Sequence, residues 1–270
     1  MRRSADWDRR THRGRRNDPR RLLWALAAST AWLCASSARA EELKPFEASY
    51  TWAWHGMTVA VSTLRLERGG GDTTAAALAP NAGPDAASAI WTYRSTSEPR
   101  GIGRMFSQRP RQESVLLIAE DGVRPLRYRA EDGTSATKND ADVEFDWTHG
   151  RIRGVYEDAK VDLPATPGVQ DDLSVQIAMI VELAQGRTSG KFTLLNKNSV
   201  RGYTYTLEGE EKQSTPLGAI DTLRFRSQRA YSPRVTRFWC APSLGYIPMK
   251  VEQTRDHDVQ WTMRVLSVKR

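Results

Sequence analysis

The segment EASYTWAW, residues 47–54, decides the fold class of this chain. Ala48, Tyr50, Trp52 and Trp54 alternate there with smaller or more polar residues. Successive side chains of a β-strand point to opposite faces, so this alternation predicts a strand with one apolar face and one solvated face.

The same pattern recurs along the chain after this segment. A turn at His55 and Gly56 leads into an apolar run at residues 57–66, and together they predict a β-hairpin. The apolar side chains of this run change from odd-numbered to even-numbered positions near Ser62 and Thr63, which predicts a β-bulge there. Further alternating strands are predicted around residues 91–93, 126–129, 143–147, 192–194, 203–207, 223–225, 238–240, 247–251 and 259–265, and residues 101–106 are typical of a short turn or helical piece. Residues 115–119 are continuously apolar and predict a strand buried on both faces.

One segment has helical spacing instead. Its apolar residues fall at i, i+4, i+7, i+8 and i+11: Leu173, Ile177, Ile180, Val181 and Ala184. Asp171 or Asp172 can cap the start of this helix, and Gly186 can end it. The polar face is narrow, so we expect the helix to be buried on most sides.

These elements predict a mainly β fold in residues 41–270. The chain shows no alternation of strands with helices, which disfavours a parallel α/β fold. We expect a single domain built as a curved antiparallel sheet, or incomplete β-barrel, packed on one apolar α-helix. Residues 69–88 are rich in glycine and alanine without periodicity, and we expect a flexible loop there.

The first 40 residues have the three parts of a secretory signal peptide. Arg20 and Arg21 precede a short apolar run at residues 22–34, and Ala38-Arg39-Ala40 fits a cleavage site. The apolar run is shorter than the roughly 20 residues that a membrane span needs. We therefore expect export to the periplasm, cleavage near Ala40, and no transmembrane segment in the mature chain.

The predicted leader also accounts for the basic character of the chain. The whole sequence has 40 Lys and Arg against 32 Asp and Glu. Residues 1–40 hold 10 arginines and 3 aspartates, which leaves 30 basic and 29 acidic residues in the predicted mature part. A near-neutral mature chain gives no reason to expect nucleic-acid binding.

The residue types that usually carry catalysis or bind metals are sparse. His55 and His149 lie beside glycines at predicted turns, and His257 lies between two aspartates at another. Cys240 is the one cysteine after the predicted cleavage site, and it alternates with Phe238 as a buried residue would. No metal-binding, nucleotide-binding or hydrolase motif occurs, so we expect no cofactor, no metal and no catalytic residues.

Arginines on predicted strand faces form a further candidate surface. They are Arg124, Arg127, Arg129, Arg224, Arg226, Arg229, Arg234 and Arg237. These side chains could bind lipid headgroups or an anionic polysaccharide, or they could be ordinary solvated residues balanced by acidic neighbours.

Aromatic residues give the stronger functional hint. Several of them recur on one side of the predicted strands and would line a ligand site: Trp52, Trp54, Trp91, Tyr93, Tyr203, Tyr205 and Trp261. They either fill a solid core or line an apolar cavity on the concave side of the sheet.

Four stretches resemble a family of exported bacterial proteins known as domain of unknown function 3108. They are Tyr-Thr-Trp at residues 50–52, the predicted helix start at 171–174, and residues 238–242 and 245–252. The resemblance implies no activity and carries over no site residues. The strand-rich layout is also similar to the half-barrels of periplasmic lipoprotein carriers, which is a likeness of fold alone.

The sequence therefore predicts a soluble, non-enzymatic envelope protein that binds a hydrophobic or amphiphilic ligand, such as a lipid, on the concave side of its sheet. Two alternatives stay open. The chain could be a structural or interaction module that supports another envelope protein, or a hydrolase of envelope polymers.

Overall fold

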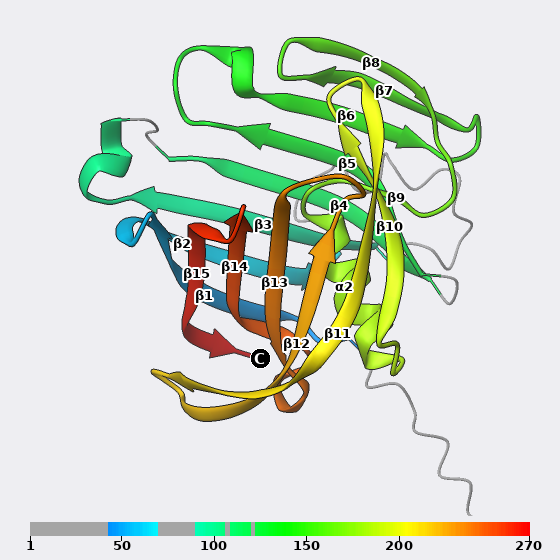
Figure 1. Ribbon diagram of the computed structural model, residues 1–270. Helices are drawn as coiled ribbons and strands as arrows, with labels where there is room; N and C mark the ends of the chain where they lie inside the picture. Colours follow the sequence, from blue (N-terminus) through cyan, green and yellow to red (C-terminus); the bar gives the residue numbers. More distant parts are fainter. Residues whose placement is uncertain (1–42, 70–89, 106–108, 120–121) are drawn as a thin grey trace, which may run out of the picture. The chain divides into compact units, whose positions relative to one another are not determined.

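One large β-sheet and one α-helix dominate the computed structural model, which describes residues 43–69, 90–105, 109–119 and 122–270 (Figure 1). The strands are β1 (Phe46–Trp54), β2 (Met57–Arg68), β3 (Ile90–Pro99), β4 (Arg111–Ala119), β5 (Gly122–Glu131), β6 (Ala141–Asp146), β7 (Arg151–Tyr156), β8 (Ala159–Pro164), β9 (Val169–Gln170), β10 (Ser189–Asn196), β11 (Ser199–Thr215), β12 (Gly218–Gln228), β13 (Arg234–Ala241), β14 (Ile247–Arg255) and β15 (Asp258–Lys269). The helices are α2 (Ser174–Ala184) and the short 3₁₀ segments η2 (Gly101–Met105), η3 (Thr137–Asn139) and η4 (Pro242–Leu244). The predicted leader and residues 70–88 of the predicted loop lie outside the described residues.

The described strands form a single sheet in the order β8-β7-β6-β5-β4-β3-β2-β1-β15-β14-β13-β12-β11-β10-β9. All neighbouring pairs are antiparallel except β9 and β10, which pair in parallel over two residues. The terminal strands β8 and β9 are not paired with each other, so the sheet stays open as it curves around α2 (Figure 1). The predicted fold class is confirmed.

Strands β1 and β2 form the predicted hairpin. Along β1, Phe46, Ala48 and Tyr50 are buried and their neighbours are partly exposed, as the alternation in the sequence predicts. His55 and Gly56 form a two-residue turn with φ values of +45° and +81°, the left-handed conformations that a tight hairpin needs.

The bulge predicted at Ser62 and Thr63 is wrong in position. The β1–β2 register shifts between Trp52 and Ala53, opposite Val59, whereas β2 pairs with β3 without a shift. Val61 lies opposite Thr51, on the other face from Leu64. The apolar residues change from odd-numbered to even-numbered positions because both faces of β2 carry apolar side chains.

Helix α2 occupies the segment with helical spacing. Leu173, Ile177 and Ile180 are buried in the main core, and Met179 and Leu183 are buried in a second cluster with residues of β11, β12 and β13. The predicted burial on most sides is therefore confirmed. The main core also contains residues of β1, β5 and β13–β15, so the helix packs against both halves of the sheet.

The segments after β3 and in β4 also have predictions from the sequence. Residues 101–105 form the short helix η2 at the place where a turn or helical piece is predicted. Val115 and Leu116 are buried on successive positions of β4, but residues 117–119 are only partly buried. Among the described residues, no helix is long and apolar enough to span a membrane.

Candidate functional site

The start of helix α2 is fixed to the sheet by a network of hydrogen bonds. Asp171 is fully buried, accepts the backbone N–H groups of Leu173 and Ser174 at 2.8 Å each, and accepts the hydroxyl of Ser114 in β4 at 2.7 Å. Burial raises the pKa of Asp171 to about 6, and the hydrogen bonds oppose this rise. Asp171 thus caps the helix, as expected from the sequence.

Tyrosines of the sheet complete this network. Tyr128 of β5 and Tyr156 of β7 donate to Asp172, at 3.4 and 2.5 Å, and Tyr93 of β3 donates to Gln176 at 3.2 Å. Burial also raises the pKa of Asp172. Asp171 and Asp172 accept hydrogen bonds from side chains of the sheet, and these bonds hold the helix in place. We therefore assign both carboxylates a structural role.

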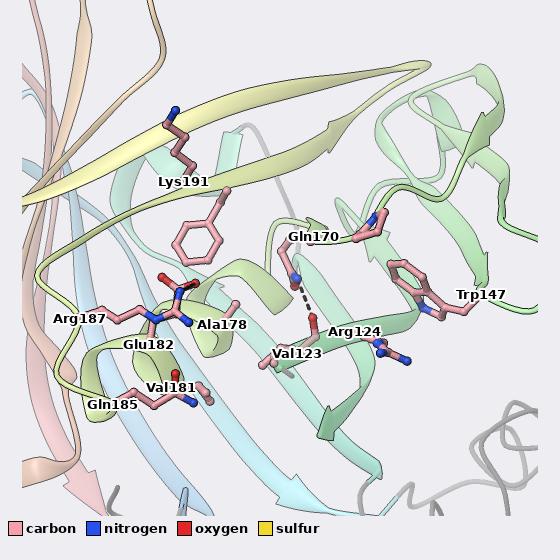
Figure 2. Close-up of a pocket in the computed structure, with 14 residues that line it drawn as sticks. Val123, Arg124, Trp147, Gln170, Ala178, Val181, Glu182, Gln185, Arg187 and Lys191 are labelled. Atoms are coloured by element: carbon pink, nitrogen blue, oxygen red, sulfur yellow. Dashed lines mark hydrogen bonds and ion pairs between the residues drawn. The ribbon is translucent and has the colours of Figure 1, made fainter. Parts of the chain in front are cut away.

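A cavity of about 420 Å³ lies beside the C-terminal half of the same helix (Figure 2). We call it the helix cavity. Its lining comes from the start of β5, the end of β6, the segment before β9, helix α2 and the start of β10. It therefore lies on the helix side of the sheet, where strands distant in sequence come together.

Apolar side chains form much of its wall. They are Val123, Trp147, Pro167, Ala178, Val181 and Phe192. The Trp147 indole is held in place by a 2.7 Å hydrogen bond to the carbonyl of Pro125. The ring of Phe192 stacks on Tyr205 at a centroid distance of 5.4 Å, so the aromatic part of the wall is built on ordered neighbours.

Charged side chains also line the cavity: Arg124, Arg187, Lys191 and Glu182. Glu182 pairs with Arg187 at 3.5 Å and accepts the hydroxyl of Tyr205, whose pKa is raised by burial and by this carboxylate. Even without Arg124, the two cations Arg187 and Lys191 outnumber the one carboxylate, Glu182, which already has two partners. This part of the lining is therefore net positive.

Gln170 provides an unusual polar group in the lining. It is 3% exposed, and its amide nitrogen donates to the carbonyl of Val123 at 2.8 Å (Figure 2). Its amide oxygen is buried without a hydrogen-bond partner. An unpaired buried acceptor costs about 1–3 kcal/mol, which a donor on a bound molecule would offset.

A second, smaller cavity of about 260 Å³ lies at the ends of β11–β14. Its lining contains Tyr203 together with Arg201, Arg229, Arg234 and Arg255, and we call it the arginine cavity. Ser227, Thr236 and Gln253 also line it, and these three lie opposite one another on β12, β13 and β14.

The structure places the seven predicted ligand residues in different environments. Trp91, Tyr93 and Tyr205 are buried core residues. Trp52 and Trp261 pack together with centroids 4.9 Å apart, and Trp54 lies opposite Trp261 and is 47% exposed. Tyr203 is the member of the set that lines a described cavity, the arginine cavity, and the helix cavity is lined by none of the seven.

Few features of the sequence point to the helix cavity. Helical spacing predicts Val181 on a buried helix face, and alternation predicts Trp147 and Phe192 in strands, but no pattern connects these three residues. Gln170 lies in a two-residue strand, too short for alternation to show. Arg187 and Lys191 follow the helix, and only the folded chain places them near Arg124.

The other candidate residues fall into ordinary environments. Cys240 is a buried thiol whose pKa burial raises to about 12. His55 and His257 occupy hairpin turns with positive φ, and His149 contacts Asp146 at 2.7 Å. Within the described ranges, no cluster of His, Cys, Asp and Glu is suited to hold a metal ion.

Four of the eight arginines of the predicted surface are paired with acids. Arg127 and Arg129 pair with Asp142, while Arg224 and Arg237 pair with Glu208. For these four, the reading as solvated residues with acidic neighbours fits. Arg229 and Arg234 differ, because both line the arginine cavity and neither pairs with a carboxylate of the described residues.

Comparison with known proteins finds one matching family and several solved structures that are similar to this chain. Residues 85–259 match DUF3108, a family described as protein of unknown function. No functionally curated protein matches the chain. A β-barrel-like protein of domain of unknown function DUF1849 from Brucella abortus is similar in structure, with a TM-score of 0.49 and 11% identity over 83% of this chain and 97% of that chain. A protein with a YmcC-like fold from Bacteroides fragilis, proposed to be exported, has a TM-score of 0.36 and 11% identity over 84% of this chain and 97% of that chain.

Proposed function

The chain belongs to the DUF3108 family, and we propose that it is a non-enzymatic envelope protein that binds an amphiphilic anion in the helix cavity. One observation carries the proposal: apolar walls and a net-positive set of side chains line the same cavity. A molecule with an apolar tail and an anionic head matches both parts. The leader predicted at residues 1–40 supports a periplasmic location for this role.

The walls suit the tail of such a ligand. The cavity volume of about 420 Å³ lies within the range of roughly 300–1,000 Å³ that is usual for small-molecule sites. Burying about 200 Å² of tail surface contributes about 5 kcal/mol at 25 cal/mol per Å². Trp147 and Phe192 are the largest apolar surfaces available for this contact.

The charged residues suit the head. Glu182 is engaged by Arg187 and Tyr205, so Lys191 supplies the excess positive charge. A carboxylate or a phosphate accepts charge-assisted hydrogen bonds from such groups. The unpaired oxygen of Gln170 further favours a ligand that carries a hydroxyl or amide donor near its head.

Titration with a fluorescent long-chain fatty acid tests the proposal. We expect saturable binding of one molecule per chain and competition by unlabelled fatty acid, but not by acetate, which lacks the tail. Arg187→Glu/Lys191→Glu should weaken binding at least about tenfold through lost charge complementarity. Val181→Phe, which narrows the cavity, should weaken it as well.

The matched control is Lys212→Glu/Arg264→Glu. It changes the net charge equally at exposed residues, of which Lys212 pairs with Asp221, and should leave the affinity within about twofold. Native mass spectrometry of protein from its own periplasm gives an independent readout. A ligand-free mass together with no uptake of fatty acid would contradict the proposal.

A further inference from the structure

Exposed apolar side chains gather at one edge of the sheet. In an antiparallel sheet the turns β1–β2, β14–β15, β12–β13 and β10–β11 lie at the same edge, together with the end of β3 and η2. Seven of the ten large hydrophobic side chains that are exposed in the described residues lie there: Trp54, Met57, Ile102, Met105, Val200, Tyr231 and Val259. We call these residues the turn edge.

This apolar surface is not the scattered exposure that any protein shows. Met105 is 81% exposed, and Tyr231 is fully exposed at the tip of the β12–β13 loop, with a φ of +58°. Trp54 and Met57 lie opposite each other beside the β1–β2 turn. Exposed side chains of this size, gathered on adjacent turns, mark an interaction surface.

The arginine cavity opens at the same edge. Arg201 is near the start of β11, Arg229 and Arg234 flank the β12–β13 loop, and Arg255 ends β14. Arg255 contacts Asp256 at 3.7 Å, whereas Arg201, Arg229 and Arg234 pair with no carboxylate in the described part of the chain. The described residues that line the cavity include no acid.

Unpaired positive charge beside exposed aromatic and aliphatic side chains is typical of surfaces that bind anionic membranes. Trp and Tyr are favoured at the membrane–water interface, and clustered basic residues are attracted to anionic lipids. Guanidinium groups also match phosphate oxygens in geometry and charge. A protein partner would need one surface that is both acidic and apolar. Any anionic bilayer offers negatively charged headgroups next to an apolar interior.

We propose that the turn edge docks onto the surface of an anionic phospholipid bilayer, with a headgroup phosphate in the arginine cavity. Trp54, Met57 and Tyr231 then lie at the level of the headgroups. This inference is independent of ligand binding in the helix cavity, because the two surfaces share no residue.

Vesicle flotation of the full chain, as its expressing cell yields it, tests the docking. Vesicles of phosphatidylcholine with 30% phosphatidylglycerol should bind the protein, at least about tenfold better than phosphatidylcholine alone, and the binding should weaken as salt rises. Arg229→Glu/Arg234→Glu should reduce binding at least about thirtyfold. Trp54→Ala/Tyr231→Ala should reduce it about fivefold or more without changing its dependence on salt.

Two controls separate the possible outcomes. Lys212→Glu/Arg264→Glu, with the same change in charge away from the turn edge, and the helix-cavity variant Arg187→Glu/Lys191→Glu should both retain vesicle binding within about threefold. Equal binding to both vesicle types, or wild-type binding by Arg229→Glu/Arg234→Glu, would overturn the proposal. So would tight binding of free glycerophosphoglycerol without vesicle binding, since the cavity would then take a soluble anion.

Discussion

The polar network at the start of helix α2 and the helix cavity beside its C-terminal half differ in how their buried polar groups are bonded. At the helix start, Asp171, Asp172 and Gln176 all accept hydrogen bonds from the sheet or from the helix backbone. In the cavity, Gln170 keeps an unpaired oxygen. The comparison indicates that the first region holds the fold together, whereas the second retains bonding capacity for a ligand.

The largest effect on stability is expected at Asp171. Asp171→Ala leaves two buried backbone N–H groups and the hydroxyl of Ser114 without an acceptor, so we expect a loss of about 4 kcal/mol in the free energy of unfolding. Urea unfolding followed by tryptophan fluorescence measures it. Asp171→Asn, which keeps one acceptor oxygen, should lose about half as much. A loss below about 1 kcal/mol for the alanine variant would contradict the structural role.

The second effect is a dependence of stability on pH. The pKa of Asp171 is raised in the fold to about 6 from the usual 3.8 of an aspartate, so the folded state binds a proton more tightly than the unfolded state. The contribution of this group is therefore most favourable below about pH 4 and is lost as pH rises to about 6, by about 3 kcal/mol. The raised pKa of Asp172 acts in the same direction.

Surface carboxylates change stability in the opposite direction. Ion pairs and hydrogen bonds lower the pKa values of residues such as Asp162, so their contribution is lost at acidic pH. The measurement is therefore the difference in unfolding free energy between wild type and Asp171→Asn from pH 4 to 7, in which these groups cancel. A difference that stays constant over this range would contradict the assignment.

The sequence predicted the first region better than the second for a physical reason. Strand alternation and the spacing of Leu173, Ile177 and Ile180 depend on which side chains are buried. Burial of one face shows as a periodic pattern over a few neighbouring residues, so it can be predicted from a short segment. Capping by Asp171 is local too, because the cap binds backbone N–H groups two and three residues later. The tyrosines that reach Asp172 are 44 and 16 residues away, and no local pattern connects them.

The candidate site depends on contacts of this distant kind. One-sided aromatic runs identify a buried face, but they do not distinguish a filled core from a hollow one. Tyr93 and Tyr205 belong to the core because neighbouring side chains fill the space around them. The helix cavity arises where β5, α2 and β10 leave a gap, and the sizes of gaps depend on three-dimensional packing.

A matched pair of substitutions sharpens the comparison directly. Gln176→Leu leaves the buried hydroxyl of Tyr93 without an acceptor, so we expect a loss of about 2 kcal/mol. Gln170→Leu removes an oxygen that has no partner and gives up one bond to the carbonyl of Val123, so stability should stay within about 1 kcal/mol of wild type. Both are measured by urea unfolding. Equal losses would mean that the two glutamines do not differ as the structure indicates.

The smallest effect on stability is expected at Arg187, and it separates binding from folding most clearly. Its ion pair with Glu182 is 3.5 Å long and its side chain is 58% exposed, so Arg187→Ala should cost no more than about 0.5 kcal/mol. Fatty-acid affinity should nevertheless fall about fivefold, because the variant removes one cation and releases Glu182 to repel the anionic head. Calorimetric titration at two salt concentrations measures this, and the deficit should shrink as salt rises. An affinity that falls only together with stability would assign Arg187 to the fold. It would then contradict the contrast between a helix start that stabilises the fold and a cavity that binds a ligand.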